Sequence, residues 1–433
     1  MAPAFSPADR DRWPRRLFCA SALALTLGYG VLAGMFGWFP QGLFARAAQG
    51  FGALVPGAAA DREWYFKTVR TPSPPPIANS GRAQPGLNLV TAIGADALEA
   101  LVLDLDGKQL HRWSIDWFQL WPDASHVPER LRPQSRPGTH IDGAVLLEDG
   151  DLVFHFEHLG MMRLDAQGQV VWRLPYQTHH SITRGDDGNL WVCGQKEHTV
   201  ALPEFPSLLP PFVEDTILEV SPEGRILREW SVPGLLRQNG REGLLCLANT
   251  DNFSTAESGD VTHLNHVEPF PARLPAGEFG PGSVLVSLRN VNTVFVFDSR
   301  SGRMQFVSTG QFVRQHDPHF LDGNTISVFD NHVLGPADPH PQSRILLLHA
   351  PDQAVKTYFA GTPEQPFFTP ILGRHQWLPN GHLLITDSCN GRAFELDRNL
   401  QVVWWYIHYV GEGVVGAVEQ VTRIPSSIAA AYR

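Results

Sequence analysis

From Leu87 onward, short apolar or alternating runs are separated by turns rich in Gly, Asp and Asn. Such runs predict β-strands, and Asp322-Gly323-Asn324 between two of them is a strong hairpin signal. The chain contains no convincing amphipathic helix in this region, so the pattern predicts an all-β fold. Matching turns recur at 104–108, 165–169, 221–225, 298–303 and 397–401, and the strand after most of them ends in an aromatic residue: Trp113, Trp172, Trp230 and Phe306.

These turns belong to a unit of four strands that repeats about every 40–55 residues, which is typical of a β-propeller. Five complete units are predicted at 138–174, 179–232, 262–308, 314–359 and 372–408. Residues 88–116 supply the later strands of a sixth unit, and the tail 419–425 supplies its first strand. We therefore predict a six-bladed β-propeller closed by pairing of the N- and C-terminal strands, which leaves no exposed sheet edge. Five or seven blades stay open, because the insertions at 117–137 and 233–261 could contain strands; a pair of β-sandwiches would not explain the repeat.

The N-terminal region has a different character. An uncharged stretch from Leu17 to Phe39 is long enough to cross a bilayer of about 30 Å, and four arginines precede it. We predict a cytoplasmic N-terminus at 1–16, an uncleaved transmembrane anchor at 17–39, and a periplasmic or other extracytoplasmic location for the remainder. Cleavage near residues 45–47 stays open. Residues 40–86 are predicted to form a juxtamembrane linker, stiffened by the proline-rich run 71–76, before a propeller domain at 87–433.

Composition excludes some functions. The net charge of −10 and the lack of a basic run argue against a nucleic-acid binder. The 4 cysteines show no paired spacing, so a structural zinc site is not expected. A Cys193–Cys246 disulfide stays open outside the cytoplasm, but buried reduced thiols are favoured.

Histidines recur near the start of the predicted first strands. The first strand of each propeller blade lines the central channel, so side chains repeated at its start converge near the axis. A lone histidine is more often a satisfied structural residue, and polar stacking around a wet channel is the plain alternative here. Several in register nevertheless favour a functional site. The histidines at such positions are His140, His179 or His180, His263, His316 and His375.

Three places are richer than the repeat requires. In the run 260–267, His263 and Asn265 share one face of a strand, because side chains alternate. In the run 284–293, an apolar strand continues into Arg289. In the run 315–319, His316 and Asp317 follow Gln315, and His319 lies beyond them on the opposite face of the strand. Turn-rich loops, an exposed hairpin or a polar strand end are the simpler interpretations. Arg, Asn and His around a pocket with few carboxylates instead predict recognition of an oxyanion, with neutral histidine as nucleophile or acid–base group.

The order of these motifs resembles the bacterial arylsulfate sulfotransferase family. The motifs are His-His-Ser at 179–181, Thr-His-Leu-Asn-His at 262–266, Ser-Leu-Arg-Asn-x-Asn-Thr at 287–293 and Gln-His-Asp at 315–317, followed by Phe-Asp-Asn at 329–331 and Leu-Pro-Asn-Gly at 378–381. The resemblance covers most of residues 88–410. It implies an exported six-bladed propeller that moves a sulfuryl group from a phenolic sulfate to a phenol, through a sulfated histidine and without a nucleotide donor.

The resemblance also implies a role for each matching residue. His316 would accept the sulfuryl group, with His319 as the less favoured candidate. His263 would protonate the leaving phenolate and later deprotonate the acceptor. Arg289, Asn265 and one of His179 or His180 would hold the sulfate oxygens. The anchor and the proline-rich linker depart from the family pattern, and no role follows for His266 or His375.

Two other functions stay open. Channel histidines could hold a transition metal, as in some propeller oxygenases, but metal-binding histidines usually have carboxylate or carbonyl partners, and Arg289 would repel a cation. A non-catalytic membrane-anchored binding module would not need these residues to converge. The expected partners are an aryl sulfate, a phenol and, through the predicted anchor, a membrane; no cofactor or metal is expected. The sequence leaves open the physiological donor and acceptor and the oligomeric state.

Overall fold

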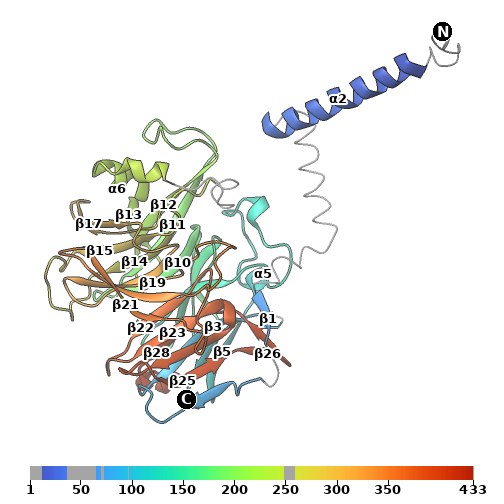
Figure 1. Ribbon diagram of the computed structural model, residues 1–433. Coiled ribbons are helices and arrows are strands. Elements are labelled where there is room, and N and C mark those ends of the chain that lie inside the picture. The colour runs from blue at the N-terminus through green and yellow to red at the C-terminus, as the bar shows by residue number, and fades with distance from the viewer. Residues whose placement is uncertain (1–11, 37–64, 70–72, 96, 248–258, 433) are drawn as a thin grey trace, which may run out of the picture. The chain divides into compact units, whose positions relative to one another are not determined.

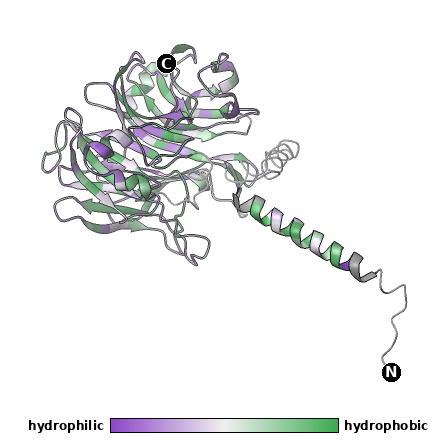
Figure 2. Cartoon of the chain, turned by 90° about the horizontal axis from the view of Figure 1, so that it is seen from above, coloured by the Kyte–Doolittle hydropathy of each residue, from purple (hydrophilic) through white to green (hydrophobic). Residues whose placement is uncertain are grey.

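The computed structural model describes residues 12–36, 65–69, 73–95, 97–247 and 259–432, in two compact units, Met1–Trp64 and Tyr65–Arg433. The first unit contains helix α2 (Arg12–Phe36), along which Figure 2 shows mainly hydrophobic residues. Within the described residues, no helix combines the length and the apolar character needed to cross a bilayer. Of the predicted transmembrane anchor at 17–39, residues 37–39 fall outside the described residues, as do residues 45–47.

The second unit is built from antiparallel sheets, labelled in Figure 1. Counting described residues, six sheets have four or more strands, and in four of them all strands follow chain order. They are β6 (Ile141–Leu146) to β9 (Val170–Leu174) through β7 (Leu152–Phe156) and β8 (Gly160–Leu164); β10 (Thr178–Arg184), β11 (Leu190–His198), β12 (Phe212–Val220) and β13 (Ile226–Ser231); β14 (Leu264–Pro269), β15 (Ser283–Leu288), β16 (Thr293–Asp298) and β17 (Met304–Thr309); β18 (His316–Phe320), β19 (Thr325–Asp330), β20 (Arg344–His349) and β21 (Ala354–Ala360); β22 (Arg374–Trp377), β23 (Leu383–Asp387), β24 (Arg392–Leu396) and β25 (Val402–Ile407); and β28 (Val418–Ile424), β3 (Leu87–Ile93), β4 (Leu98–Leu103) and β5 (Gln109–Ile115).

The first strands of these six sheets contact one another in a ring, in the order β6, β10, β14, β18, β22, β28 and back to β6. The hydrophobic core follows the same ring, because each of six buried apolar clusters lies between two neighbouring sheets. One cluster contains Val153 of β7 and Val192 of β11, and another contains Leu384 of β23 and Val90 of β3. The predicted all-β propeller is confirmed, and the sheets are called blades below.

The strand at the C-terminus completes the blade that begins the unit. β28 pairs with β3 in an antiparallel register that includes Val421↔Val90 and Ile424↔Leu87. This is the head-to-tail pairing expected from the incomplete repeats. It gives both strands a hydrogen-bonded neighbour and so removes two sheet edges.

The recurring aromatic residue at the end of outer strands has a structural reason. The indole Nε1 of Trp113 donates to the carbonyl of Asp165 at 2.9 Å, and that of Trp172 donates to Pro222 at 3.0 Å. Each acceptor lies in the turn before the last strand of the next blade. Every such bond connects neighbouring blades and satisfies a buried indole N–H.

The predicted linker is partly built into the second unit, which begins at Tyr65 and not at residue 87. β2 (Ile77–Asn79) pairs with β25 as a fifth strand, and β1 (Phe66–Thr68) forms a small sheet with β27 (Val414–Gly416) and β26 (Tyr409–Gly411). The proline-rich run is docked as well, since Trp405 Nε1 donates to the carbonyl of Pro75 at 3.1 Å.

The insertions contain short helices and no additional blade in their described parts. The first holds α5 (Trp117–Leu120) and η1 (Glu129–Leu131), and the second holds α6 (Val232–Gln238) and η2 (Glu242–Cys246), before residues 248–258, which are outside the described set. The remaining short helices are η3 (Ser388–Asn390) and η4 (Ser426–Tyr432). All four cysteines are free; Cys193 is buried as favoured, whereas Cys246 is exposed.

Candidate active site

Residues at the starts of the first strands meet in a narrow cavity. Its interior has about 10 Å³ of room, roughly that of one water molecule. Five of its charged or imidazole side chains come from five different first strands, so the ring of blades brings together residues far apart in the sequence. The lining residues that carry polar side chains are Asp142, His180, Asn265, His316, Asp317, Arg374 and Glu419.

His316 is held by one ring nitrogen. Its Nδ1 lies 2.7 Å from Asn331 Oδ1 and 3.1 Å from the carbonyl oxygen of Arg314. Both partners are acceptors, so Nδ1 carries the hydrogen and Nε2 carries the lone pair. The Nε2 atom is buried and has no hydrogen-bond partner within the described part of the chain. Burial, together with the charge of Arg289, lowers the pKa of His316 to about 3, so its imidazole is neutral at pH 7.

His263 and His180 form a pair beside this histidine. Their Nε2 atoms lie 3.2 Å apart, and the His180 and His316 rings are stacked with centroids 6.1 Å apart. The Nδ1 of His263 donates to the carboxylate of Asp260. Burial and the charge of Arg289 lower the pKa of His263, while Asp260 acts in the opposite direction. Although burial alone would raise the pKa of Asp260, the charge of His263 lowers it to about 2, so the carboxylate is ionised.

The two consecutive histidines differ in position. His180 lines the cavity, whereas His179 lies behind it, with its Nδ1 2.9 Å from Nδ1 of His180. The Nε2 of His179 points toward the Asp215 carboxylate, 3.9 Å away. Of the two, only His180 therefore lies where it could reach a ligand in the cavity.

Arg289 is not one of the residues that line the cavity, unlike Asn265, but its charge acts on His263 and His316. Asn265 lines the cavity and donates from Nδ2 to the carbonyl of Gln315 at 2.7 Å. Arg289 donates from its backbone N–H to the carbonyl of His263 at 3.0 Å, and its guanidinium reaches Asn290 Oδ1 at 3.2 Å. Burial lowers the pKa of Arg289 to about 10, so it remains a cation at pH 7. A fixed positive charge beside neutral imidazoles suits an anionic ligand.

The geometry at three of these positions departs from a regular strand. His180, His263 and Asp317 have positive φ angles of 57°, 53° and 46°, and the ladder shifts register near the start of β10, β14 and β18. Such bulges turn side chains out of strict alternation. This is why the consecutive residues His316 and Asp317 both line the cavity. His263 precedes β14 and has a positive φ angle, so the predicted regular alternation of His263 and Asn265 along one strand is wrong.

The family comparison supplies an independent finding. The model of the family described as Arylsulfotransferase (ASST) matches residues 143–409, which is more than half of the chain and includes all six predicted site residues. The chain belongs to the arylsulfotransferase family. A search of curated proteins finds no match.

Solved structures resemble this chain at low identity. A protein of unknown function from Bacteroides caccae has 14% identity and a TM-score of 0.49, covering 79% of this chain and 99% of that one. Virginiamycin B lyase from Staphylococcus aureus has 11% identity and a TM-score of 0.38, covering 79% and 89% of the two chains. The Cps50 (Swd1) β-propeller domain of Myceliophteria thermophila has 9% identity and a TM-score of 0.39, covering 79% and 89%. At such identity these similarities carry no information on chemistry.

Three charged residues of the cavity were not predicted from the sequence. Arg374 donates to the carbonyl oxygens of Asp142 and His180, the latter at 2.6 Å. Burial raises the pKa of the Asp142 carboxyl and raises that of Glu419 well above its usual value. Both oxygens of Glu419 are buried with no partner among the described residues. Arg374, Asp142 and Glu419 all lie near the start of a first strand, which is the position that the predicted histidines share. That shared position was the signal that could have identified them.

The other histidines belong to different surroundings. His319 has both ring nitrogens engaged, with Nε2 3.1 Å from Asp317 Oδ2 and Nδ1 3.2 Å from Glu268 Oε1. Although burial alone would lower the pKa of His319, these two carboxylates raise it to about 10. His319 therefore offers no free nitrogen, in contrast to His316. His140 is paired with Glu157 at 3.0 Å.

The four-histidine metal centre considered from the sequence is not supported. In the described residues, three groups of side chains could hold a metal ion, and none includes His180, His263 or His316. These groups are His266, Glu268 and His319; Asp317, His319 and His375; and His140, Asp142 and Glu157.

Proposed function

We propose that this arylsulfotransferase moves a sulfuryl group from an aryl sulfate to a phenol through a covalent sulfohistidine at His316. One observation carries the proposal. The neutral imidazole of His316, which lines the cavity, is oriented through Nδ1 by Asn331 and Arg314, and its buried Nε2 keeps a lone pair with no partner in the described structure. An oriented, desolvated and unprotonated nitrogen is what a nucleophile requires.

The first half-reaction forms the intermediate. The Nε2 lone pair attacks sulfur, the bond between sulfur and the aryl oxygen breaks, and the phenolate leaves with that electron pair. His263 supplies the proton that the phenolate needs. An anionic sulfate nearby and the Asp260 carboxylate both favour the protonated form of His263, so its pKa rises when the donor binds.

The second half-reaction reverses these steps with a different phenol. His263 removes the proton of the acceptor hydroxyl, the oxygen attacks sulfur, and the bond between nitrogen and sulfur breaks to return the neutral imidazole. Splitting one transfer into two steps lowers each barrier and predicts ping-pong kinetics.

Arg289, Asn265 and His180 are proposed to stabilise the charge on the sulfuryl oxygens. Arg289 is a buried cation near His316, and the Asn265 amide carries a second N–H besides the one that Gln315 accepts. The cavity has room for about one water, so a sulfuryl group requires these side chains to shift on binding. His179 supports His180 from behind in this proposal.

The test uses the purified full-length chain with 4-nitrophenyl sulfate as donor and phenol as acceptor. We expect nitrophenol release that depends on phenol, parallel double-reciprocal lines, and one added SO₃ on the peptide containing His316 when the acceptor is omitted. His316→Ala should lower the rate at least about a thousandfold, the scale of losing a covalent nucleophile. His349→Ala is the matched control, because His349 is exposed on β20. Equal rates in the two variants would remove His316 from this role.

We also propose that the propeller lies outside the cytoplasm, because four arginines precede the uncharged N-terminal stretch. Cell fractionation with protease accessibility tests this location. A non-catalytic binding role would give no acceptor-dependent release from any aryl sulfate, with the fold intact.

A further inference from the structure

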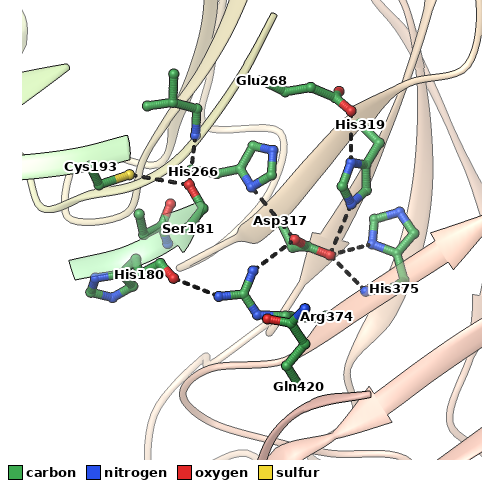
Figure 3. A network of polar contacts seen from close by, with 12 residues as sticks. His180, Ser181, Cys193, His266, Glu268, Asp317, His319, Arg374, His375 and Gln420 are labelled. Atoms are coloured by element: carbon green, nitrogen blue, oxygen red, sulfur yellow. Dashed lines mark hydrogen bonds and ion pairs between the residues drawn. The ribbon is translucent and has the colours of Figure 1, made fainter. Parts of the chain in front are cut away.

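A second group of polar side chains lies on the other side of Asp317 from the proposed nucleophile. It joins three blades, since His266 comes from β14, Asp317 and His319 from β18, and His375 from β22. Figure 3 shows His266, His319, His375 and Arg374 converging on the Asp317 carboxylate. The proposed sulfuryl transfer uses none of the side chains of His266, His319, His375 and Arg374.

From this group, we propose a binding site for a divalent transition-metal ion, with Asp317, His319 and His375 as ligands and Zn²⁺ as the first candidate. Asp317 Oδ2 lies 3.1 Å from His319 Nε2 and 3.4 Å from His375 Nδ1, and the three donor atoms lie within 4.8 Å of one another. Ligands about 2.0–2.2 Å from a metal stand roughly 3.0–3.5 Å apart, so little movement would be needed.

Both histidines have the partners that metal-binding histidines need. His319 Nδ1 lies 3.2 Å from Glu268 Oε1, and Glu268 Oε2 is fixed by the backbone N–H of Phe320 at 2.8 Å. His375 Nε2 lies 2.8 Å from Ser327 Oγ. These contacts leave His319 Nε2 and His375 Nδ1 directed at the same carboxylate oxygen. A carboxylate or hydroxyl behind each imidazole fixes the tautomer and strengthens the ligand.

Three buried nitrogens point to an occupant. His375 Nδ1 and both ring nitrogens of His266 have no hydrogen-bond partner among the residues that the structure describes, although the two residues are only 4% and 1% exposed. Burying such groups unsatisfied costs free energy. A metal ion would satisfy His375 directly. His266 Nδ1, 3.5 Å from Asp317 Oδ1, is placed to become a fourth ligand.

Charge and access are compatible with a cation. Asp317 and Glu268 supply two carboxylates, while Arg374 is 3.5 Å from the other oxygen of Asp317, Oδ1. In the metal-free chain both ring nitrogens of His319 are held by these carboxylates, so an incoming ion displaces the proton on Nε2. The ligands border a cavity of about 410 Å³, from which water or a small ligand could complete the coordination. Two imidazoles and one carboxylate suit Zn²⁺, Co²⁺ or Fe²⁺ better than Mg²⁺ or Ca²⁺.

The third candidate group is weaker. It contains only one histidine, His140, and Asp142 Oδ2 already accepts from the backbone N–H of His180 at 2.9 Å. This cluster therefore serves as an internal comparison for the proposed site.

The test measures metal stoichiometry in the full-length chain after chelator treatment and reloading with Zn²⁺ alone, and then titrates the metal-free chain with Co²⁺. We expect about one Zn²⁺ per chain, a Co²⁺ absorption spectrum typical of four or five ligands, and a higher Tm with metal. His375→Ala and Glu268→Gln should each weaken Co²⁺ binding at least about tenfold, as loss of a ligand or of its carboxylate partner does.

Two controls isolate the site. His349→Gln removes an exposed histidine and should bind as wild type, and His140→Gln should do the same. No stoichiometric metal in the wild-type chain would overturn the proposal, and this measurement stands even if a variant fails to fold. Loss of binding in His140→Gln but not in His375→Ala would also overturn it, because it would assign the metal to the third group. Sulfuryl transfer is not needed for any of these readouts.

Discussion

Asn331→Ala tests the link between tautomer and reactivity. Asn331 Oδ1 accepts from Nδ1 of His316 at 2.7 Å. Its own orientation is fixed, because Nδ2 donates to the carbonyl oxygens of Thr369 and Leu372, both at 2.8 Å. The variant removes the acceptor that keeps the hydrogen on Nδ1, so more molecules carry it on Nε2, where it blocks attack on sulfur.

The structure sets the size of this effect. The carbonyl of Arg314, at 3.1 Å, remains as a weaker acceptor for Nδ1, so the tautomer preference falls without vanishing. Loss of one buried hydrogen bond is worth about 1–3 kcal/mol. At 1.36 kcal/mol for each factor of ten, kcat/KM should fall about 5- to 150-fold.

The assay compares kcat/KM for 4-nitrophenyl sulfate at saturating phenol. Asn399→Ala is the control, since Asn399 is exposed in the turn before β25. Nitrogen NMR of the histidine-labelled chain should show the His316 tautomer shifting toward Nε2–H. A well-folded Asn331→Ala chain with kcat/KM within twofold of wild type would show that Asn331 does not control the reactivity of His316.

Three further predictions concern acid–base chemistry, packing and pH. His263→Gln should lower the rate of sulfuryl transfer by about 10²–10⁴-fold. The loss should be greater with phenyl sulfate than with 4-nitrophenyl sulfate, because the poorer leaving group depends more on protonation. An equal loss for both donors would argue against His263 as a general acid. Gly143→Ala places a Cβ against the carbonyl oxygen of His180 and should reduce kcat/KM about tenfold or more. Gly243→Ala is the control, because its Cβ would meet open space, and it should leave kcat/KM unchanged. Equal kcat/KM values for the two variants would show that the contact with His180 is tolerated. Burial lowers the pKa of His408 from 6.5 to about 4, so its stabilising contribution is complete above pH 6.5 and is lost as the pH falls toward 4, at most about 3 kcal/mol. The drop in Tm between pH 7.5 and 4.5 should therefore be smaller in His408→Gln, and an unchanged drop would contradict this assignment.

Much of the propeller could be predicted because its signals are local. A strand that packs between two blades needs apolar residues, and a tight turn needs Gly, Asp or Asn, so the period of these signals marked the blades. The predicted unit 372–408 corresponds to strands from Arg374 to Ile407, and the tail at 419–425 corresponds to β28. The linker boundary was misplaced because proline runs without periodicity do not indicate whether they dock on a sheet. In this chain Pro74 and Pro75 accept hydrogen bonds from the side chains of Tyr409 and Trp405.

The site was predictable in part for the same reason. His180, His263, Asn265 and His316 were expected near the axis from their position in the repeat, and all lie there. Their different surroundings were not predictable. His316 has a free Nε2 because Asn331, which directly follows β19, binds its other ring nitrogen, Nδ1. His319 lies between Asp317 and Glu268 and has no free nitrogen.

The all-β repeat, the pairing of the chain's two ends and the kinds of side chain near the axis could be predicted from the amino-acid order, because each depends on residues close together in the chain or on their spacing. Which of those side chains share a cavity, and which nitrogen keeps its lone pair, became visible only in the folded molecule. Those outcomes depend on bulges at the strand starts and on contacts between blades, such as Arg374 with the carbonyl of His180. Burial then sets the protonation of each group through its distance from neighbouring charges, and such distances exist only in the folded ring.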